Sequence, residues 1–135
     1  MLFGQKKESK GIRILIADDN EVDRTLIEKT LEKEGYAVIK AENGQQAMDL
    51  AQSQKPDVIV LDCEMPVMGG VEALQHLRTN LETKDIPVIF LTSVDTPRNI
   101  VDCFDLEAAN YLSKPLTPKF LLSEIAMILE EKEEE

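Results

Sequence analysis

The amino-acid sequence predicts an α/β protein: a doubly wound, five-stranded parallel sheet with helices on both faces. Five short apolar segments alternate with segments of helical periodicity, a pattern typical of parallel sheets covered by helices. The central segment, 57–62, has four consecutive apolar residues before a carboxylate, as expected of a strand buried on both faces. We expect one domain over 12–131, between a flexible N-terminal arm (1–11) and an acidic tail (132–135).

The first two β–α units follow the arm. Residues 12–17 form a short apolar strand, and a helix is expected over 21–34, with Asn20 as its N-cap. Acidic residues stand in the first turn of this helix and lysines in its last turns, as the helix dipole favours. Its expected buried stripe consists of Val22, Leu26, Ile27, Thr30 and Leu31. A second strand is expected over 36–41 and a second helix over about 43–54.

Three further units complete the predicted sheet. After the central strand, a third helix begins near Gly70, with Val71, Leu74, Leu77 and Leu81 at helical spacing. The remaining strands are 87–91, which is followed by Thr92, and the short segment 111–112. Helices are expected over 97–108 and from residue 118 onward, because a Thr-Pro pair at the start of each supplies an N-cap and a proline at the first helical position.

Composition limits the classes of function. The net charge of −11 makes direct binding to nucleic acid unfavourable, because phosphates would be repelled. No apolar run approaches the roughly 20 residues that span a bilayer, and residues 1–10 do not resemble a signal peptide. We therefore expect a cytoplasmic protein with no membrane insertion. Cys63 and Cys103 suit that compartment as free thiols, and their spacing matches no metal motif.

Residues whose side chains can bind an ion or take part in a reaction stand at the ends of four of the five predicted strands. They are Asp18, Asp19, Asp62, Thr92 and Lys114. Because parallel strands present their carboxyl ends at one edge of the sheet, we expect these side chains to lie together. Three neighbouring carboxylates repel one another unless a cation intervenes, and ligands that are all oxygen favour Mg²⁺. The lysine and threonine would suit the oxygens of a phosphoryl group carried by Asp62 as an acyl phosphate.

Four motifs resemble the receiver domain of two-component response regulators. They are 14–20 with its Asp-Asp pair, 61–66, 90–93 and 111–115. The resemblance covers about 12–131 and implies the flavodoxin-like strand order 2-1-3-4-5. It also implies a phospho-acceptor module of a two-component or phosphorelay system that turns over no separate substrate.

The same resemblance implies a role for each site residue. Asp62 would accept a phosphoryl group from the phosphohistidine of a histidine kinase or a histidine phosphotransfer protein. Mg²⁺ would be bound by Asp18 (mainly through water), Asp19, Asp62 and the backbone carbonyl of Glu64. Thr92 and Lys114 would contact the phosphoryl oxygens, and Thr92 and Tyr111 would form the switch.

Further expectations come from the resemblance. The Lys114–Pro115 bond is predicted to be cis, and Glu64 and Val94 are predicted to set the lifetime of the phosphoryl group. The output surface would comprise the helix 97–108, the fifth strand and the last helix, and would bind an unidentified downstream protein; a phosphorylation-dependent dimer is left open.

Three departures from the family pattern are Ser93 in place of alanine, Gly69-Gly70 in place of Asp-Gly, and Glu107 in place of glycine.

Two other classes of protein share part of this pattern. A hydrolase of the haloacid-dehalogenase type also uses a strand-end aspartate and Mg²⁺, but it expects Asp-x-Asp on the first strand and a cap domain, whereas this chain has Asp-Cys-Glu on the third strand. A flavin- or nucleotide-binding module would be expected to carry a glycine-rich phosphate loop, and neither G-x-G-x-x-G nor G-x-x-x-x-G-K occurs.

Overall fold

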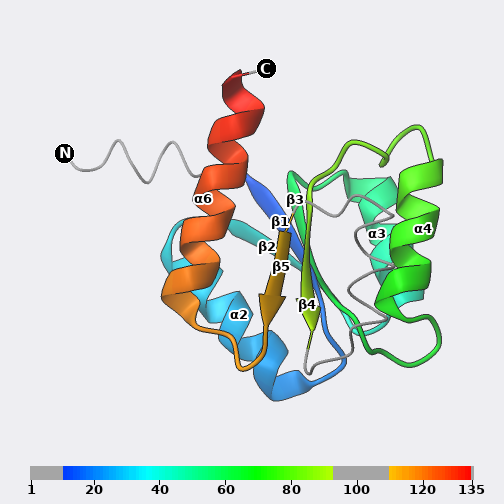
Figure 1. Ribbon diagram of the computed structural model, residues 1–135, viewed down its shortest axis with the longest axis horizontal. Coiled ribbons are helices and arrows are strands. Elements are labelled where there is room, and N and C mark those ends of the chain that lie inside the picture. Colours follow the sequence, from blue (N-terminus) through cyan, green and yellow to red (C-terminus); the bar gives the residue numbers. More distant parts are fainter. Residues whose placement is uncertain (1–10, 93–109, 135) are drawn as a thin grey trace.

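The computed structural model describes residues 11–92 and 110–134 and contains one five-stranded parallel sheet in the order β2-β1-β3-β4-β5 (Figure 1). The strands are β1 (Arg13–Ala17), β2 (Ala37–Ala41), β3 (Val58–Asp62), β4 (Val88–Thr92) and β5 (Asn110–Ser113). The described helices are α2 (Glu21–Lys33), α3 (Gly44–Gln54), α4 (Gly70–Thr79) and α6 (Pro118–Glu134). The predicted fold class and strand order are confirmed. The predictions for the helix 97–108 and for Ser93, Val94, Cys103 and Glu107 lie outside the described residues.

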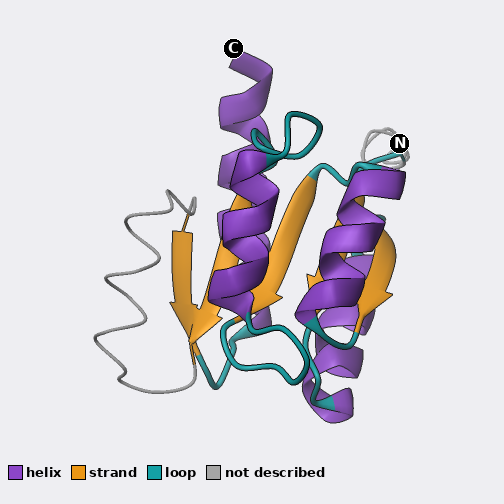
Figure 2. Ribbon diagram, turned by 90° about the vertical axis from the view of Figure 1, so that its right-hand side faces the viewer, coloured by secondary structure: helices purple, strands orange, loops and turns teal. Residues whose placement is uncertain are grey.

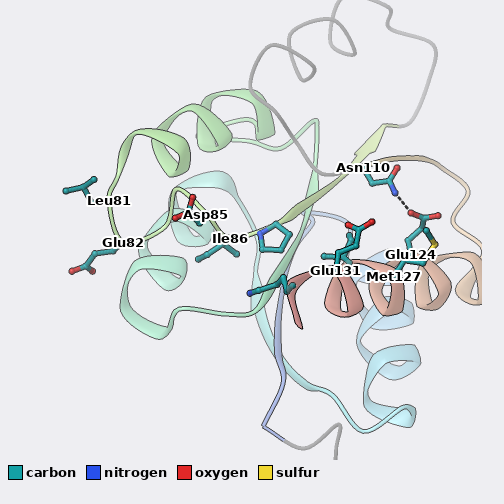
Figure 3. A pocket seen from close by; sticks show the side chains of 11 residues that line it. Leu81, Glu82, Asp85, Ile86, Asn110, Glu124, Met127 and Glu131 are labelled. Carbon is teal, nitrogen blue, oxygen red and sulfur yellow. Dashed lines mark hydrogen bonds between the residues drawn. The ribbon is translucent and has the colours of Figure 1, made fainter. Parts of the chain in front are cut away.

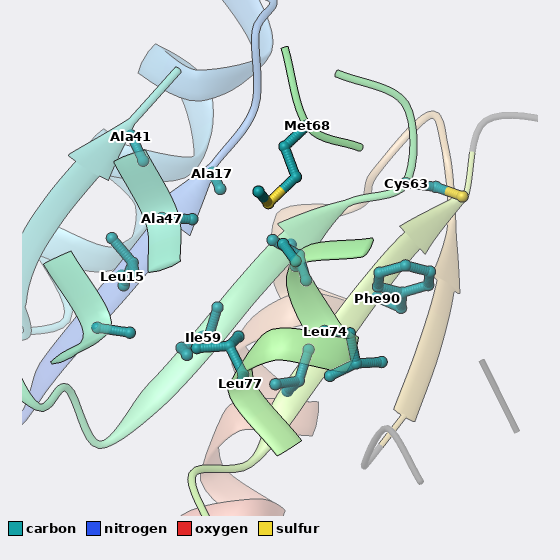
Figure 4. Close-up of a cluster of buried hydrophobic side chains, with 14 residues drawn as sticks. Leu15, Ala17, Ala41, Ala47, Ile59, Cys63, Met68, Leu74, Leu77 and Phe90 are labelled. Carbon is teal, nitrogen blue, oxygen red and sulfur yellow. The ribbon is translucent and has the colours of Figure 1, made fainter. Parts of the chain in front are cut away.

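Alternating side chains of the buried strands divide the core into two layers. Leu15 of β1 and Ile59 of β3 point toward α3 and α4, in the cluster drawn in Figure 4. Ile14 and Val58, one position earlier in each strand, point to the other face, where α2 and α6 cover the sheet. Figure 2 shows α3 and α4 lying over their face of the sheet. Full burial of such a side chain contributes about 1.5–3 kcal/mol, so both helical layers are needed.

Two predicted apolar positions of α2 are exposed. Ile27 and Leu31 are buried as predicted, but Val22 and Leu26 are 76% and 47% exposed, so the prediction for these two residues was wrong. The first turns of α2 extend past the carboxyl ends of the strands, where the sheet offers nothing to cover them (Figure 1). Helical periodicity identifies the apolar stripe but does not say how far along it the sheet reaches.

The end of α4 also differs from the prediction. The helix ends at Thr79, and Leu81, expected on its buried stripe, is 83% exposed. Asn80 has extended backbone angles, and its side-chain oxygen accepts a hydrogen bond from the Glu82 amide at 2.8 Å. This local bond competes with the next helical turn, which is why asparagine is a poor residue in a helix interior.

The last helix continues further than predicted. It reaches Glu134, so most of the residues assigned to an acidic tail prolong α6. Lys132 lies within donor distance of the backbone carbonyl of Asp57, at 3.4 Å. Asp57 in turn accepts a hydrogen bond from the Arg13 amide at 2.8 Å, next to the start of β1. No helix within the described ranges is long and apolar enough to cross a bilayer.

Two glycines hold the loop after β3 close to the helices. The amide of Gly70, the first residue of α4, donates to the Cys63 carbonyl at 2.9 Å, and a Cβ at Gly70 would overlap the Asp62 carbonyl. The amide of Gly44, the first residue of α3, donates to the Met68 carbonyl at 2.9 Å, and a Cβ there would overlap that carbonyl. The absence of side chains at these positions therefore fixes the loop that follows Asp62.

Gly70→Ala is expected to lower the free energy of unfolding by about 2 kcal/mol or more, because the new methyl group would meet backbone atoms that cannot move aside. Gly69→Ala is the matched control. A Cβ at Gly69 lies 3.5 Å from the Cys63 carbonyl, an ordinary contact, so we expect a loss below about 1 kcal/mol. Urea denaturation of both variants measures the difference, and equal losses would contradict the account of Gly70.

Candidate functional site

Three carboxylates meet at the carboxyl edge of the sheet. Asp18 follows β1 and Asp62 ends β3, and the residues before them, Ala17 and Leu61, are register partners. Carboxylate oxygens of Asp18, Asp19 and Asp62 all lie within 4.8 Å of one another. Asp18 and Asp62 are buried, with 0% and 4% exposure, whereas Asp19 is exposed. The predicted acidic cluster is therefore present, and parallel register is what forms it.

The ammonium group of Lys114 partly neutralises the negative charge of these carboxylates. Its Nζ donates to Asp18 Oδ2 at 3.0 Å, Asp62 Oδ2 at 3.2 Å and Asp23 Oδ2 at 3.3 Å. The Lys114 amide donates to the Thr92 carbonyl at 2.8 Å, which ties the end of β5 to the end of β4. The Lys114–Pro115 bond is cis, as predicted. The lysine, which follows β5, thus reaches past the end of β4 to the carboxylates at the ends of β1 and β3.

Burial and charge shift two pKa values in the site. Burial raises the pKa of the Asp62 carboxyl to about 6, and the neighbouring Asp18 carboxylate adds to the rise, although Lys114 opposes it. For Lys114, burial favours the neutral amine, but hydrogen bonding to Asp18 and the charge of Asp62 outweigh burial and raise the pKa. The ammonium group therefore stays charged, whereas the site opposes the ionisation of Asp62.

Thr92 and Tyr111, the residues predicted to form the switch, lie on β4 and β5, on the same side of β3 as Lys114. Thr92 is buried at the end of β4, one residue beyond Leu91, which pairs with Asp62. Tyr111 of β5 pairs with Phe90 and packs, half-buried, against the core layer under α3 and α4. Thr92 and Tyr111 thus occupy adjoining strands, a placement compatible with coupling between them.

An open hollow of about 560 Å³ gives access to the carboxylates. It is lined by Asp19, Asn20, Asp23, Asp62, Glu64, Met65, Pro66 and Lys114. The Glu64 amide donates to Asp62 Oδ1 at 3.3 Å, and its side chain is exposed. The carboxylates of Asp18, Asp19 and Asp62 lie within reach of one ion, and those of Asp19 and Asp62 line the open hollow. Together they form the all-oxygen donor set that suits Mg²⁺. The residues present therefore fit this ion.

Asp23 is a site residue that sequence reasoning missed. The sequence suggested only that its charge favours the first turn of α2. The available signal was its position: it stands three residues after the N-cap Asn20, on a helix that begins at the carboxyl edge of the sheet. Its amide donates to Asn20 Oδ1 at 2.9 Å, which leaves the carboxylate free to reach Lys114.

A second large hollow, of about 460 Å³, lies at the opposite edge of the sheet. Figure 3 shows it between the loop that carries Leu81 and Asp85 and the side of α6 that carries Met127 and Glu131. The Asn110 side-chain amide donates to Glu124 within it. Its lining includes none of the predicted site residues, so it is separate from the acidic cluster.

Comparison with known proteins identifies the family. The family model described as response regulator receiver domain matches residues 14–126. This chain belongs to that family. The receiver domain is 39% identical to protein PilH of Pseudomonas aeruginosa over 117 residues, which cover 87% of this chain and 97% of PilH. It is 36% identical over 119 residues to the phosphate regulon transcriptional regulatory protein PhoB of the same organism, but these cover only 52% of PhoB, so the chain spans about half of that relative.

A solved structure supports the same conclusion. The chemotaxis response regulator CheY4 of Vibrio cholerae matches this receiver domain with a TM-score of 0.80 and 32% identity, over 86% of this chain and 97% of the other. The chain is thus a phospho-acceptor signalling module of the two-component type with the flavodoxin-like strand order. Receiver domains bind Mg²⁺ through an acidic pocket, and the cluster of Asp18, Asp19 and Asp62 corresponds to it. Membership also implies interaction with histidine kinases or phosphotransfer proteins.

Asp62→Asn is expected to stabilise the receiver domain near neutral pH when EDTA removes divalent cations. The pKa of Asp62 is raised to about 6 in the folded state, above its value of about 3.9 in an unfolded chain. The folded state therefore binds the proton more tightly, and the wild type loses stability as pH rises from about 4 to 6. The asparagine variant has no such loss, so its advantage should grow by roughly 2–3 kcal/mol between pH 4 and pH 7.

Urea denaturation across this pH range measures that advantage. An advantage that stays constant with pH would contradict the shifted pKa. Asp49→Asn, at an exposed position of α3, is the control and should show no comparable trend.

Proposed function

We propose that Asp62 is the phospho-acceptor of this receiver domain and that the phosphohistidine of a histidine kinase or phosphotransfer protein is the donor. One observation carries the assignment: Asp62 is the buried carboxylate that both lines the open hollow and contacts Lys114. Asp18 is buried too, but it does not line that hollow, and Asp19 is exposed and has no contact with the lysine among the described residues. The proposal includes no turnover of a separate substrate.

In the proposed transfer, a carboxylate oxygen of Asp62 attacks the phosphorus atom of the phosphohistidine. The new O–P bond forms as the N–P bond breaks, and the electron pair of the N–P bond returns to the imidazole nitrogen. Lys114 and the Thr92 hydroxyl would donate hydrogen bonds to the phosphoryl oxygens. Mg²⁺, bound by Asp18, Asp19, Asp62 and the Glu64 carbonyl, would supply the positive charge that offsets repulsion between carboxylates and phosphoryl oxygens.

We propose that phosphorylation is passed on through the β4–β5 side of the sheet. A charge-assisted hydrogen bond from Thr92 to the phosphoryl group would draw that side chain toward Asp62, and the ring of Tyr111 would turn into the vacated space. The output surface would include β5, α6 and residues 97–108, and a downstream protein would recognise it. Glu64 and Val94 would set the lifetime of the acyl phosphate by flanking the approach of water.

Asp62→Asn is expected to abolish labelling by acetyl phosphate in the presence of Mg²⁺, because the amide is not a competent nucleophile for phosphoryl transfer. Intact-mass measurement with peptide mapping locates the phosphoryl group. Asp49→Asn should be labelled like the wild type. Labelling that persists at another aspartate of the Asp62→Asn variant would refute the assignment.

The phosphodonor protein would dock on α2 and the loop after β5. Val22 and Leu26 present exposed apolar surface on the first turns of α2, and Leu26 lines a hollow together with Asp23 and Lys114. Between them and the β5–α6 loop lies a hollow of about 370 Å³, lined by Asp23, Leu26, Ile27, Leu91, Lys114, Pro115 and Leu116. A partner seated there would hold its histidine near Asp62, because Lys114 and Asp23 line both this hollow and the acidic one. Apolar surface left exposed at this point is typical of a recognition site.

Leu26→Glu is expected to slow phosphotransfer from a histidine kinase that labels the wild type by about tenfold, because a charge would replace apolar contact area. Labelling by acetyl phosphate should stay unchanged, since that donor needs no docking surface. The matched control is Leu81→Glu, which adds the same charge at an exposed leucine on the opposite edge. Equal transfer rates for the two variants would exclude this docking face.

A further inference from the structure

Asp23 is a third carboxylate bound to Lys114. An ammonium group has three N–H donors, and those of Lys114 are directed to Asp18, Asp62 and Asp23 at 3.0, 3.2 and 3.3 Å. The Asp23 side chain is 43% exposed, whereas those of Asp18 and Asp62 are 1% and 5% exposed. Asp23 is not among the carboxylates close enough together to share a metal ion.

We propose that Asp23 is a positioning residue that holds Lys114 at the rim of the site and competes with the phosphoryl group for its ammonium. This inference rests on the proposed function, since it assigns Asp23 a part in the cycle of Asp62. Asp23 acts only through the lysine. Two consequences follow, one for the metal-free site and one for the site that carries a phosphoryl group.

The first consequence concerns the cation. In the metal-free site the Lys114 ammonium donates hydrogen bonds to Asp18 and Asp62, two of the three carboxylates that fit Mg²⁺. Binding of a divalent cation there requires those oxygens, so the ammonium must give them up. Asp23 is the described partner that remains for Lys114, because it stands outside the metal cluster. It therefore favours cation binding by receiving the lysine.

The second consequence concerns the phosphoryl group. A phosphoryl group on Asp62 offers oxygens that carry more charge than the carboxylate they replace, and Lys114 is the ammonium within reach of that carboxylate. Asp23 holds the same ammonium from a more exposed position and so competes with the phosphoryl oxygens for it. Asp23 therefore lowers the affinity of the site for a phosphoryl group, although it raises the affinity for the cation.

The position of Asp23 in the first turn of α2 suits it to hold Lys114. Its amide is bound to the N-cap Asn20, so the first turn holds the side chain beside Lys114. Glu21 stands in the same acidic first turn but is exposed and makes no hydrogen bond or ion pair with Lys114. Glu21→Gln therefore removes the same charge from the same helix end and serves as the control for Asp23→Asn.

The test measures two equilibria in the full chain by NMR titration. For the unphosphorylated protein, Asp23→Asn should raise the Kd for Mg²⁺ by about threefold to tenfold, whereas Glu21→Gln should change it less than twofold. At saturating Mg²⁺, the affinity for beryllofluoride, an anionic mimic of a phosphoryl group, should rise by about threefold in Asp23→Asn. A change that merely damaged the fold would weaken both equilibria, so the opposite signs identify the positioning role.

Two further variants complete the design. Asp23→Glu, which keeps the carboxylate on a longer side chain, should return both affinities toward the wild-type values. In a Lys114→Met background, the effect of Asp23→Asn on beryllofluoride affinity should fall to that of Glu21→Gln, because the residue acts through the lysine. Thermal unfolding of every variant checks that the fold is kept.

The outcomes separate this inference from the proposed function. If the wild type takes up no phosphoryl group at Asp62, the proposed function fails. If the wild type is labelled at Asp62 but Asp23→Asn behaves like Glu21→Gln in both titrations, the positioning role of Asp23 is wrong and the phospho-acceptor stands. Changes of the same sign in both titrations would also overturn it.

Discussion

Repulsion among carboxylates gathered at one edge of the sheet is the constraint on which this receiver domain depends. Asp18 and Asp62 lie almost out of water, where the charged form of a carboxyl group is costly, and Asp19 stands beside them. A single ammonium, that of Lys114, offsets two buried negative charges and a third at the rim. The charges do not balance among these side chains, and that residual negative charge makes the site receptive to a divalent cation.

The fold keeps this unfavourable arrangement in place by burying apolar surface elsewhere. Two core layers hold the strands in parallel register, so their carboxyl ends cannot separate to relieve the repulsion. Unfavourable charge of this kind persists only where the surrounding structure determines it, and it is typical of functional sites. The loss of stability at Asp62 thus falls on the carboxylate that we propose as the phospho-acceptor.

Residues at strand ends were the part of the site that sequence could predict. Asp62, Thr92 and Lys114 each follow an apolar segment, and parallel strands bring such positions to one edge whatever the details of the loops. Asp23 was missed because its contact with Lys114 depends on the direction in which α2 leaves the edge, which helical periodicity does not determine. The exposure of Val22 and Leu26 has the same cause, since periodicity defines a face of the helix but not the length of sheet beneath it.

The glycine contacts beside Asp62 give the domain a preferred direction of movement. At Gly44 and Gly70, backbone lies against backbone with no side chain between, so the loop after β3 and the helices α3 and α4 form a stiff support. On the other side, Lys114 reaches Asp62 through a long side chain whose torsions can change without moving the sheet. A change at Asp62 would therefore be resisted by the backbone contacts around α3 and α4 and accommodated by side chains on the β4–β5 side, with the half of the molecule around α3 and α4 as the fixed frame.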